Sequence, residues 1–539
     1  MRNRNVVLLQ LALIFLVWSY VATLHWQNDG LWFQGDSPRH AANGLFWKEF
    51  LTSGSLNPQD YALRYYARYP VISPTNYPPV FYILEGAAFT ALHPSPYVAK
   101  SLVLGFALLA ACYLMAWLRR WVAEEAGWMA ALLLLLPGFV VWSNTVMLNV
   151  PATAFSIAAL YHARRWMEAE PSDKHQLYLA AVFSVCATLT YFVAGILVFI
   201  IAGWLLSSRR WALLWDRRTL CVALVSAIPL IPFLYIALKW APIYVSFVTT
   251  GPQKAGTVSG WIFYLRELLP LAGPCVLALS VSGMLVGTIR RRWRHESFVL
   301  LVFLLVNYLA LSLIVAKESR YGLLLCVPIV CFCAIAIQSV SELPSWRKIA
   351  RFAALPAMLI LLLAQFWIAS RTSVPRIQGI AEAVAFIERV APDEPVFYDG
   401  FYSNVFTFYI QAGDPGYRRR VVLGPKLLYA SAINPLWRYE SYVNSSEDII
   451  KALLIRGGCR WLAIEISDQA GEAPAARLLR ETVQGPQFEK IRSFPVSGLD
   501  LNRIDVYRFK LDPQPSDEAD LPFPILGKGT RYKVKPIQR

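Results

Sequence analysis

The chain has 539 residues, of which 56% are hydrophobic and 16% are charged, and its formal net charge is +16. Apolar runs of about 20 residues, the length that crosses a bilayer, recur through most of the chain. The positive charge does not indicate nucleic-acid binding, because the arginines cluster between apolar runs, as the positive-inside bias requires. The sequence therefore predicts a polytopic, mostly α-helical membrane protein, with membrane lipids and no nucleic acid among its partners.

A short basic segment precedes the first apolar run, at residues 6–24. This pattern resembles a signal peptide, but the bulky Trp26 and the following Gln27 stand where small residues would mark a cleavage site. We predict an uncleaved first span with its N-terminus in the cytoplasm. The apolar segment 78–92 is assigned to a juxtamembrane or re-entrant helix, since a full crossing there would place every later arginine cluster outside.

About eleven spans follow from this assignment, and all arginine clusters between them become cytoplasmic. The outer side then carries the long loop 25–96, a turn near 144–151, a loop at 239–262 and a turn at 317–321. No short cytoplasmic loop contains a glycine-rich phosphate cradle, which argues against a soluble nucleotide as energy source. After the first span, the predicted spans are 97–118, 128–145, 150–163, 177–190, 192–207, 220–238, 263–289, 298–316, 322–340 and 352–371.

The composition changes after residue 371, where charges become mixed and apolar runs shorten. Two segments have helical periodicity and four resemble short strands, so residues 372–512 are predicted to form a small extracytoplasmic α/β domain. The remaining residues, 513–539, form a proline-rich tail whose composition is typical of poor order. Seven of the eight cysteines fall in apolar runs and only Cys459 lies in this region, which argues against a disulfide or a Cys-rich metal site there.

Four features in this order resemble the GT-C superfamily of membrane glycosyltransferases. They are Asp36 in the first outer loop, an aromatic and basic stretch at 61–70, the Pro-Pro helix start at 78–82, and the pair Arg320-Tyr321 before a late apolar helix. Within that superfamily the chain is most similar to the bacterial family 39 or protein-mannosyltransferase-like group, which includes the lipid A aminoarabinose transferases. The resemblance covers most of residues 1–371 and implies a transmembrane GT-C domain there.

The resemblance implies a polyprenyl-phosphate sugar as donor, and a lipid, a glycan or an exported protein as acceptor. Related proteins often have a second acidic residue before a proline in a later outer turn, where this chain has Asn149. An amide can orient a hydroxyl, but it neither takes a proton nor binds a divalent ion strongly. We therefore expect no cofactor and no metal site, although weak dependence on a divalent cation stays open. His40 and His93 are isolated and lack the spacing of zinc ligands.

Asp36 is the predicted catalytic base, because displacement at an anomeric carbon needs a base within reach of the attacking hydroxyl. The alternative is that it only caps a helix that begins at Ser37-Pro38. Arg320, Lys317 and Tyr321 are predicted to bind the lipid phosphate, with interfacial anchoring as the alternative.

Three further residues are candidates for substrate binding. Arg64 and Arg68 lie among tyrosines, where they could bind phosphate or a sugar, but an amphipathic interfacial helix has the same pattern. Glu85 lies in an apolar segment, where a carboxylate is costly unless it lines a wet cavity or pairs with a cation such as a first-loop arginine.

The leading hypothesis is an inverting glycosyltransferase of the bacterial cytoplasmic membrane that uses a polyprenyl-phosphate sugar at the outer face. A second hypothesis is a flippase or transporter of lipid-linked sugars, although no internal repeat is visible. A third is a GT-C-like scaffold protein without activity, which Asn149 keeps open. The sugar and the acceptor are not determined by the sequence.

Overall fold

The chain divides into two compact units, each built from separate segments. Unit 1 contains residues 1–27, 77–81 and 101–374, and unit 2 contains residues 28–76, 82–100 and 375–539. Most of the first outer loop therefore belongs to the same unit as the C-terminal region. The computed structural model describes residues 2–33, 35–73, 77–168, 175–235, 238, 257–314, 317–340, 347–432, 438–467, 473–498, 501–514, 518–522 and 531–538.

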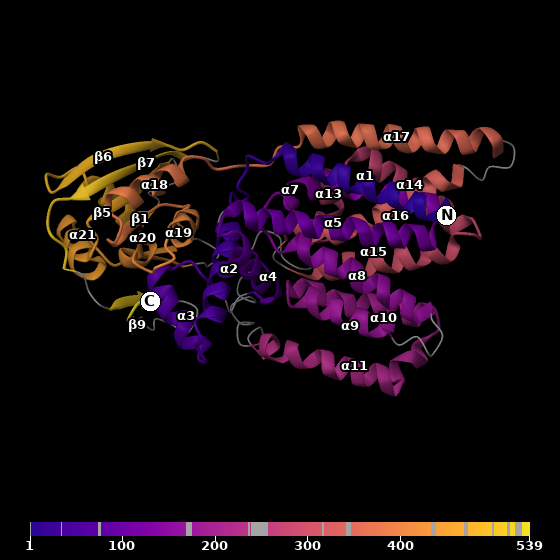
Figure 1. Cartoon of the computed structure of the whole chain (residues 1–539), viewed down its shortest axis with the longest axis horizontal. Helices are drawn as coiled ribbons and strands as arrows, with labels where there is room; N and C mark the ends of the chain where they lie inside the picture. Colours follow the sequence, from indigo (N-terminus) through magenta and orange to yellow (C-terminus); the bar gives the residue numbers. More distant parts are fainter. Residues whose placement is uncertain are drawn as a thin grey trace. The chain divides into compact units, whose positions relative to one another are not determined.

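Unit 1 is a bundle of apolar helices, many of which run along the same direction (Figure 1). The described residues of all eleven predicted spans fall mainly on helices of this unit, whereas residues 236–237 and 315–316 and most of the predicted loop 239–262 lie outside the described residues. The helices are α1 (Arg2–Leu24), α5 (Pro96–Trp121), η1 (Glu124–Met129), α6 (Ala130–Leu135), α7 (Pro137–Ser143), α8 (Asn149–Glu168), α9 (His175–Thr188), η2 (Phe192–Ile196), α10 (Leu197–Ser207), η3 (Trp211–Trp215), α11 (Arg217–Ala227), η4 (Ile228–Leu230), α13 (Val258–Ala272), α14 (Pro274–Ile289), α15 (Arg294–Leu313), η5 (Ser319–Leu325), α16 (Cys326–Val340) and α17 (Arg347–Arg371).

By length and composition, five single helices among the described residues could cross a membrane, and the number rises to seven if two bent pairs count as spans. Several further helical segments are apolar but shorter, including α9 and the Pro356–Arg371 part of α17. Two predicted spans are not straight. The chain bends by 61° before α7, at Pro137, and by 115° between α13 and α14, where Gly273 has a positive φ of 85°. Segment 263–289 is thus a sharply bent helix pair and not the single span that was predicted.

Three of the basic clusters gather at one end of unit 1. Glu168 at the end of α8 lies 3.5 Å from Arg120 of α5 and 3.3 Å from Arg164, and Arg210 donates to the neighbouring Met167 carbonyl. Arg164 also pairs with Glu296 at the start of α15, at 2.5 Å. Because α15 starts at this end, the turn that follows it lies at the opposite end. The structure thus brings together clusters that the topology prediction assigns to one side.

Close helix contacts in unit 1 depend on glycine. A Cβ atom on Gly283 of α14 would lie 1.8 Å from the Phe332 carbonyl oxygen of α16, so no larger residue fits. Small residues let helix backbones approach closely where the hydrophobic effect cannot drive helices together.

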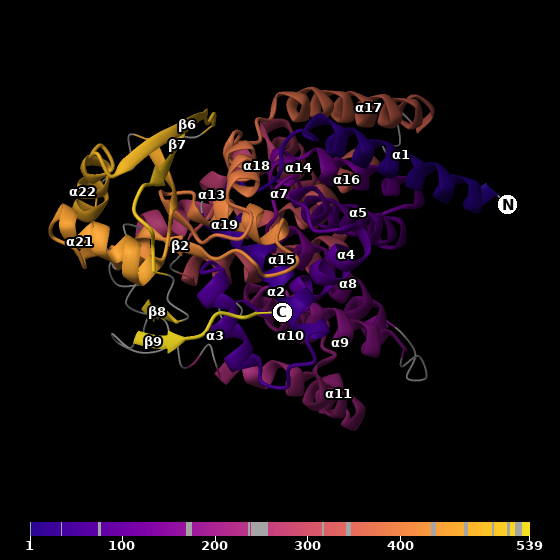
Figure 2. The ribbon, with the colours of Figure 1, turned by 60° about the vertical axis from the view of Figure 1, so that its left-hand side comes forward.

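Unit 2 contains a five-stranded sheet of order β2-β1-β5-β7-β6, in which β1 is parallel to both β2 and β5 and the remaining pairs are antiparallel. Figure 2 shows β6 and β7 as a long pair at one edge. All four predicted strands are present, and β2 was not predicted. The strands of this sheet are β1 (Val396–Asp399), β2 (Val421–Leu423), β5 (Trp461–Ser467), β6 (Phe488–Pro495) and β7 (Leu501–Phe509).

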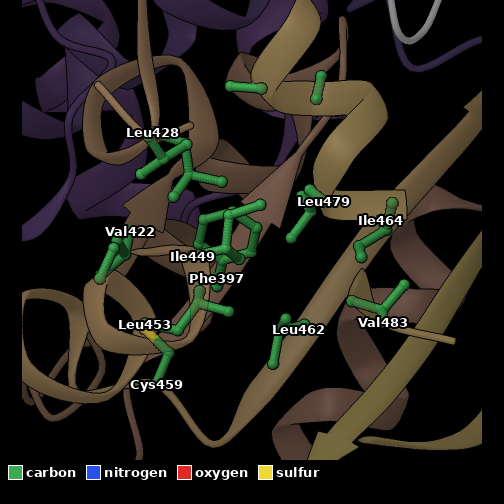
Figure 3. Close-up of a cluster of buried hydrophobic side chains, with 14 of the residues drawn as sticks. Phe397, Val422, Leu428, Ile449, Leu453, Cys459, Leu462, Ile464, Leu479 and Val483 are labelled. Carbon is green, nitrogen blue, oxygen red and sulfur yellow. The ribbon is translucent and has the colours of Figure 1, made fainter. Parts of the chain in front are cut away.

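Apolar side chains of β1 and β5 pack against helices on one face of this sheet. Leu479 of α22 and Val483, the residue after this helix, lie beside Leu462 and Ile464 of β5 (Figure 3). Cys459 lies in the same core as a free, buried thiol. The helices of this region are α18 (Ile380–Val390), α19 (Ser403–Ala412), α20 (Gly424–Leu427), α21 (Ser446–Lys451), the π-helical η7 (Ala452–Gly457) and α22 (Pro474–Thr482).

The first outer loop contributes α2 (Asp36–Thr52), α3 (Pro58–Arg68) and most of α4 (Val80–Leu92) to unit 2, and α2 packs against α19. A second pair of strands, β3 (Tyr429–Ala432) and β4 (Arg438–Ser441), lies outside the main sheet. The described part of the tail contains a third pair, β8 (Ala519–Pro522) and β9 (Arg531–Val534), and the poor order expected of the tail stays a prediction. Ala519 packs against Ala67 of α3, which explains why this segment is held.

Candidate active site

Asp36 is the first residue of α2, and its side chain is 24% exposed. Arg39, one turn later, approaches it at 3.7 Å. The N-cap position is occupied by Gly35, whose lack of a side chain leaves the cap without a side-chain hydrogen bond, and the Ser37 hydroxyl accepts from the Phe33 amide at 3.0 Å. Asp36 therefore does not occupy the capping position that the alternative interpretation assigned to it. A carboxylate in the first helical turn is still favoured by the helix dipole.

Helix α19 holds the turn that precedes Asp36. The Asn404 amide donates to the Gly35 carbonyl at 2.9 Å, and Gln411 of the same helix donates to the Tyr65 hydroxyl at 2.9 Å. A Cβ atom on Gly35 would lie 2.7 Å from Asn404 Nδ2, so a larger residue here would displace the Asn404 side chain. The start of α2 is thus fixed by a helix that lies far away in the sequence.

A second carboxylate of the first loop, Asp29, was not singled out by sequence reasoning. It is buried, and its two oxygens accept from the Leu31 amide at 2.9 Å and from the Tyr409 hydroxyl at 2.7 Å. Burial raises the pKa of Asp29 above its ordinary value of 3.8, although these hydrogen bonds and Lys100 act in the opposite direction. Since both oxygens have partners in the protein, the contacts of Asp29 are those of a structural residue.

The two first-loop arginines have different surroundings. Arg68 is buried and donates to the Ile537 carbonyl at 2.7 Å and to the Arg419 carbonyl at 2.9 Å, so it joins α3 to the C-terminal tail. Arg64 is 44% exposed, and it lies 4.0 Å from Asp60 on the same helix. The substrate-binding role predicted for each stays a prediction, and the contacts of Arg68 are those of a structural residue.

Glu85 is fully buried in α4, and its two oxygens have no hydrogen-bond partner among the described residues. It packs against α2 so closely that a Cβ atom on Gly44 would lie 2.2 Å from its Oε2. Among the described residues, Glu85 forms no ion pair with an arginine of the first loop. An unpaired carboxyl in such a place is far less costly when neutral than when charged.

In unit 1, a pocket with an empty volume of about 350 Å³, its open mouth included, brings together three of the predicted residues: Asn149, Arg320 and Tyr321. Asn149 is the first residue of α8, and the other two lie in η5. The side chains that line the pocket come from α8, η2, α15, η5 and the residue before η2: Asn149, Ala152, Thr153, Ser156, Tyr191, Val193, Ala194, Ile196, Asn307, Arg320, Tyr321 and Leu324.

Arg320 is the cation of this pocket, and it is 4% exposed. Its guanidinium lies 2.8 Å from the Glu318 carboxylate, 5.4 Å from the centre of the Tyr321 ring, and 3.6 Å from the sulfur of Met147 just before α8. A guanidinium beside the N-terminus of a helix is suited to an anion, because both present hydrogen-bond donors and positive charge.

Lys317 does not line the pocket. Its ammonium donates to the carbonyls of Ser312 and Ile314 at 2.8 Å and of Leu311 at 3.3 Å, at the end of α15. These three bonds account for all of its hydrogens and complete the C-terminus of the helix, which a cation also stabilises through the helix dipole. The predicted phosphate-binding role of Lys317 stays a prediction, and its observed contacts are those of a helix cap.

Within the residues that the structure describes, no three His, Cys, Asp or Glu side chains are grouped as metal ligands. His40 instead shares a hydrogen bond of 2.7 Å with the Tyr82 hydroxyl. Sequence reasoning missed Asn404 and Asn307. Asn307 had a detectable signal, since it is a lone amide in the apolar run 298–316, whereas Asn404 lies in an ordinary amphipathic helix and had none.

The family model for dolichyl-phosphate-mannose-protein mannosyltransferase matches residues 48–250 of the chain. A search of the curated proteins finds no match. Among solved structures, ArnT from Cupriavidus metallidurans bound to undecaprenyl phosphate has a TM-score of 0.64 at 13% identity, over 95% of this chain and 99% of that one. AglB, an oligosaccharyltransferase from Archaeoglobus fulgidus, in complex with an inhibitory peptide and a dolichol-phosphate, has a TM-score of 0.55 at 13% identity, over 91% and 74%.

This protein is a multi-pass membrane protein with the GT-C fold, which confirms the resemblance expected from the order of its motifs. Within this class, its fold is similar to that of ArnT along nearly the whole length of both chains.

Proposed function

We propose that the protein is a glycosyltransferase that moves a sugar from a polyprenyl-phosphate donor to a hydroxyl group of a lipid, glycan or protein. The observation that carries the proposal is the buried Arg320, which lines a pocket together with Asn149 at the N-terminus of α8 within a GT-C fold. A guanidinium in this position can bind the negatively charged phosphate of a lipid carrier. The undecaprenyl phosphate of ArnT and the dolichol-phosphate of AglB support the same donor class.

In the proposed reaction, the acceptor oxygen forms a bond to the anomeric carbon while the bond from that carbon to the phosphate oxygen breaks. Asp36 takes the proton of the acceptor hydroxyl, and the polyprenyl phosphate leaves with the bonding electron pair. Arg320 stabilises the negative charge that develops on this phosphate. A single displacement of this kind inverts the configuration at the anomeric carbon. Asn149 orients a hydroxyl or a phosphate oxygen without taking a proton.

The site is proposed to open on the outer face of a bacterial cytoplasmic membrane. Support comes from the gathering of Arg120, Arg164 and Arg210 at the end of unit 1 opposite to Arg320, since basic residues are enriched on the cytoplasmic side. Nucleotide sugars are cytoplasmic, so an outer site calls for a donor that is carried by a lipid.

The purified protein tests the proposal directly. It should transfer sugar from polyprenyl-phosphate sugars extracted from the membranes of its native cells, and it should not use nucleotide sugars. Asp36→Asn should lower the rate by about 10² to 10⁴, the range expected for loss of general-base help. Asp60→Asn is a matched control, because Asp60 is also a first-loop carboxylate paired with an arginine in its own helix, but it is 59% exposed.

Three results would contradict the proposal. Full activity of Asp36→Asn would exclude this residue as the base, and turnover with a nucleotide sugar alone would exclude a lipid donor. Movement of lipid-linked sugar without bond formation would instead indicate a transporter. A chelator should have little effect, because an aspartate and an amide make a poor divalent site.

A further inference from the structure

The pocket of unit 1 extends beyond Arg320 along a polar strip. Asn149, Thr153 and Ser156 are spaced four and three residues apart, so they share one face of α8. Asn307 of α15 lines the same pocket. At a rise of about 1.5 Å per residue, Ser156 lies roughly 10 Å along α8 from Asn149. The polar lining thus continues inward from the helix end into the bundle.

One of these polar groups lacks a partner. Asn307 is 1% exposed, and its Nδ2 has no hydrogen-bond partner among the described residues. Ser156 is also buried, and its hydroxyl donates to the Ala152 carbonyl at 2.7 Å, which leaves its oxygen free to accept. A donor and an acceptor that face one pocket match a hydroxyl group, which can accept from one and donate to the other.

Aromatic side chains complete the lining of the pocket. Tyr191 and Tyr321 line the pocket, and their ring centres are 5.9 Å apart. Aromatic rings of this kind present apolar faces to the C–H face of a sugar.

We propose that this pocket holds the glycosyl headgroup of the donor, and that Asn307, Ser156 and Thr153 recognise its hydroxyl groups. The inference rests on the proposed function, because it assumes that Arg320 binds the donor phosphate. A polyprenyl chain is the other possible occupant, but an alkyl chain would leave the Asn307 amide and the Ser156 oxygen without partners at a cost. The polar lining therefore favours the sugar.

The test compares binding of donor and bare carrier by the full-length protein. Polyprenyl-phosphate sugars extracted from the native membranes are mixed with an equal amount of synthetic undecaprenyl phosphate, and native mass spectrometry measures which lipids the purified protein retains. The wild type should be enriched in the glycosylated lipid. Asn307→Leu should lower this enrichment by roughly three- to tenfold, the effect of one hydrogen bond, and should leave binding of undecaprenyl phosphate unchanged.

Thr153→Val provides a second variant of nearly unchanged volume, and it should lower the enrichment in the same way. Ser297→Ala is the matched control, because Ser297 lies on α15 like Asn307 and its buried hydroxyl also lacks a partner among the described residues, yet it does not line the pocket. This variant should keep the wild-type enrichment.

The outcomes separate the two proposals. Equal retention of both lipids by the wild type, unchanged in Asn307→Leu and Thr153→Val, would overturn the headgroup pocket while leaving the lipid-phosphate donor intact. Retention of neither lipid would overturn the proposed function itself. Preferential retention of bare undecaprenyl phosphate would show that the pocket takes the carrier and not the sugar.

Discussion

The side-chain amide of Asn404 donates a hydrogen bond of 2.9 Å to the carbonyl of Gly35, the residue immediately before Asp36. The bond joins the start of α2 to α19, so the C-terminal region positions the backbone that carries the proposed base. If Asp36 is the base, as proposed, a change in this hydrogen bond should alter the rate of sugar transfer.

Asn404→Ala should therefore lower kcat of sugar transfer by roughly two- to tenfold, the loss expected for one hydrogen bond, with little change in the KM of the donor. Tyr409→Phe is the control, because it removes a bond from the same helix to Asp29 and leaves the Gly35 contact in place. It should lower the melting temperature and preserve kcat. Equal kcat losses in both variants would show that α19 acts only through general stability.

Arg320 and Lys317 lie in one turn, but we expect only Arg320 to bind the donor, whereas Lys317 caps α15. Arg320→Lys should raise the donor KM by at least about tenfold, because a lysine does not replace the planar, bidentate guanidinium. Lys317→Met should leave the donor KM unchanged and cost about 1 kcal/mol of stability through loss of the cap on α15. Steady-state kinetics and thermal melts measure the two effects. A large KM increase in Lys317→Met would assign the phosphate to Lys317 as well.

Asp29 should make the stability of the protein depend on pH. Its pKa is raised by burial, so the folded state binds its proton more tightly than the unfolded state does. The stabilisation is therefore complete below the ordinary pKa of 3.8 and is lost as pH rises through the higher pKa of the folded state. Asp29→Asn should flatten this part of the curve in thermal melts from pH 4 upward. An identical pH profile in both proteins would contradict the assignment.

Gly44 and Glu85 should behave as a coupled pair. Gly44→Ala would place its Cβ atom 2.2 Å from Glu85 Oε2, so the buried Glu85 side chain must shift or α2 and α4 must separate, at a cost of about 1–3 kcal/mol. Glu85→Ala removes the obstructing side chain and should make Gly44→Ala much less costly. A double-mutant cycle of melting temperatures measures this coupling. Additive effects would show that the two side chains do not limit the helix approach.

The topology of unit 1 was largely predictable because it depends on local signals. The eleven spans predicted from span length and arginine clusters fall mainly on helices, and Arg120 and Arg164 meet at one end of the bundle. The sharp bend at Gly273 was not predicted, since an apolar run of 27 residues, 263–289, has the composition of one long span. Composition fixes which residues avoid water, but it does not fix where a helix axis turns.

The candidate sites were predictable only in part. Asn149 was expected to orient a hydroxyl and Arg320 to bind the donor phosphate, and the two residues line one pocket. Lys317 and Arg320 could not be separated from sequence, because only the folded turn shows that one meets helix carbonyls and the other lines the pocket. The partnership of Gly35 with Asn404 was also invisible, since it joins residues that are distant in the chain and that carry no shared motif.

The interleaved make-up of unit 2 has a consequence for biogenesis. Helix α2 packs against α19, yet most of the chain separates them, including nearly all of the membrane spans. At about 5–20 residues per second, a ribosome needs roughly 20–70 s to make the intervening segment. During that time the apolar face of α2, which includes Ala41 and Leu45, is not yet covered by α19. Nascent chains are therefore exposed to aggregation and proteolysis until the last third of the chain has been made and α19 can cover this face.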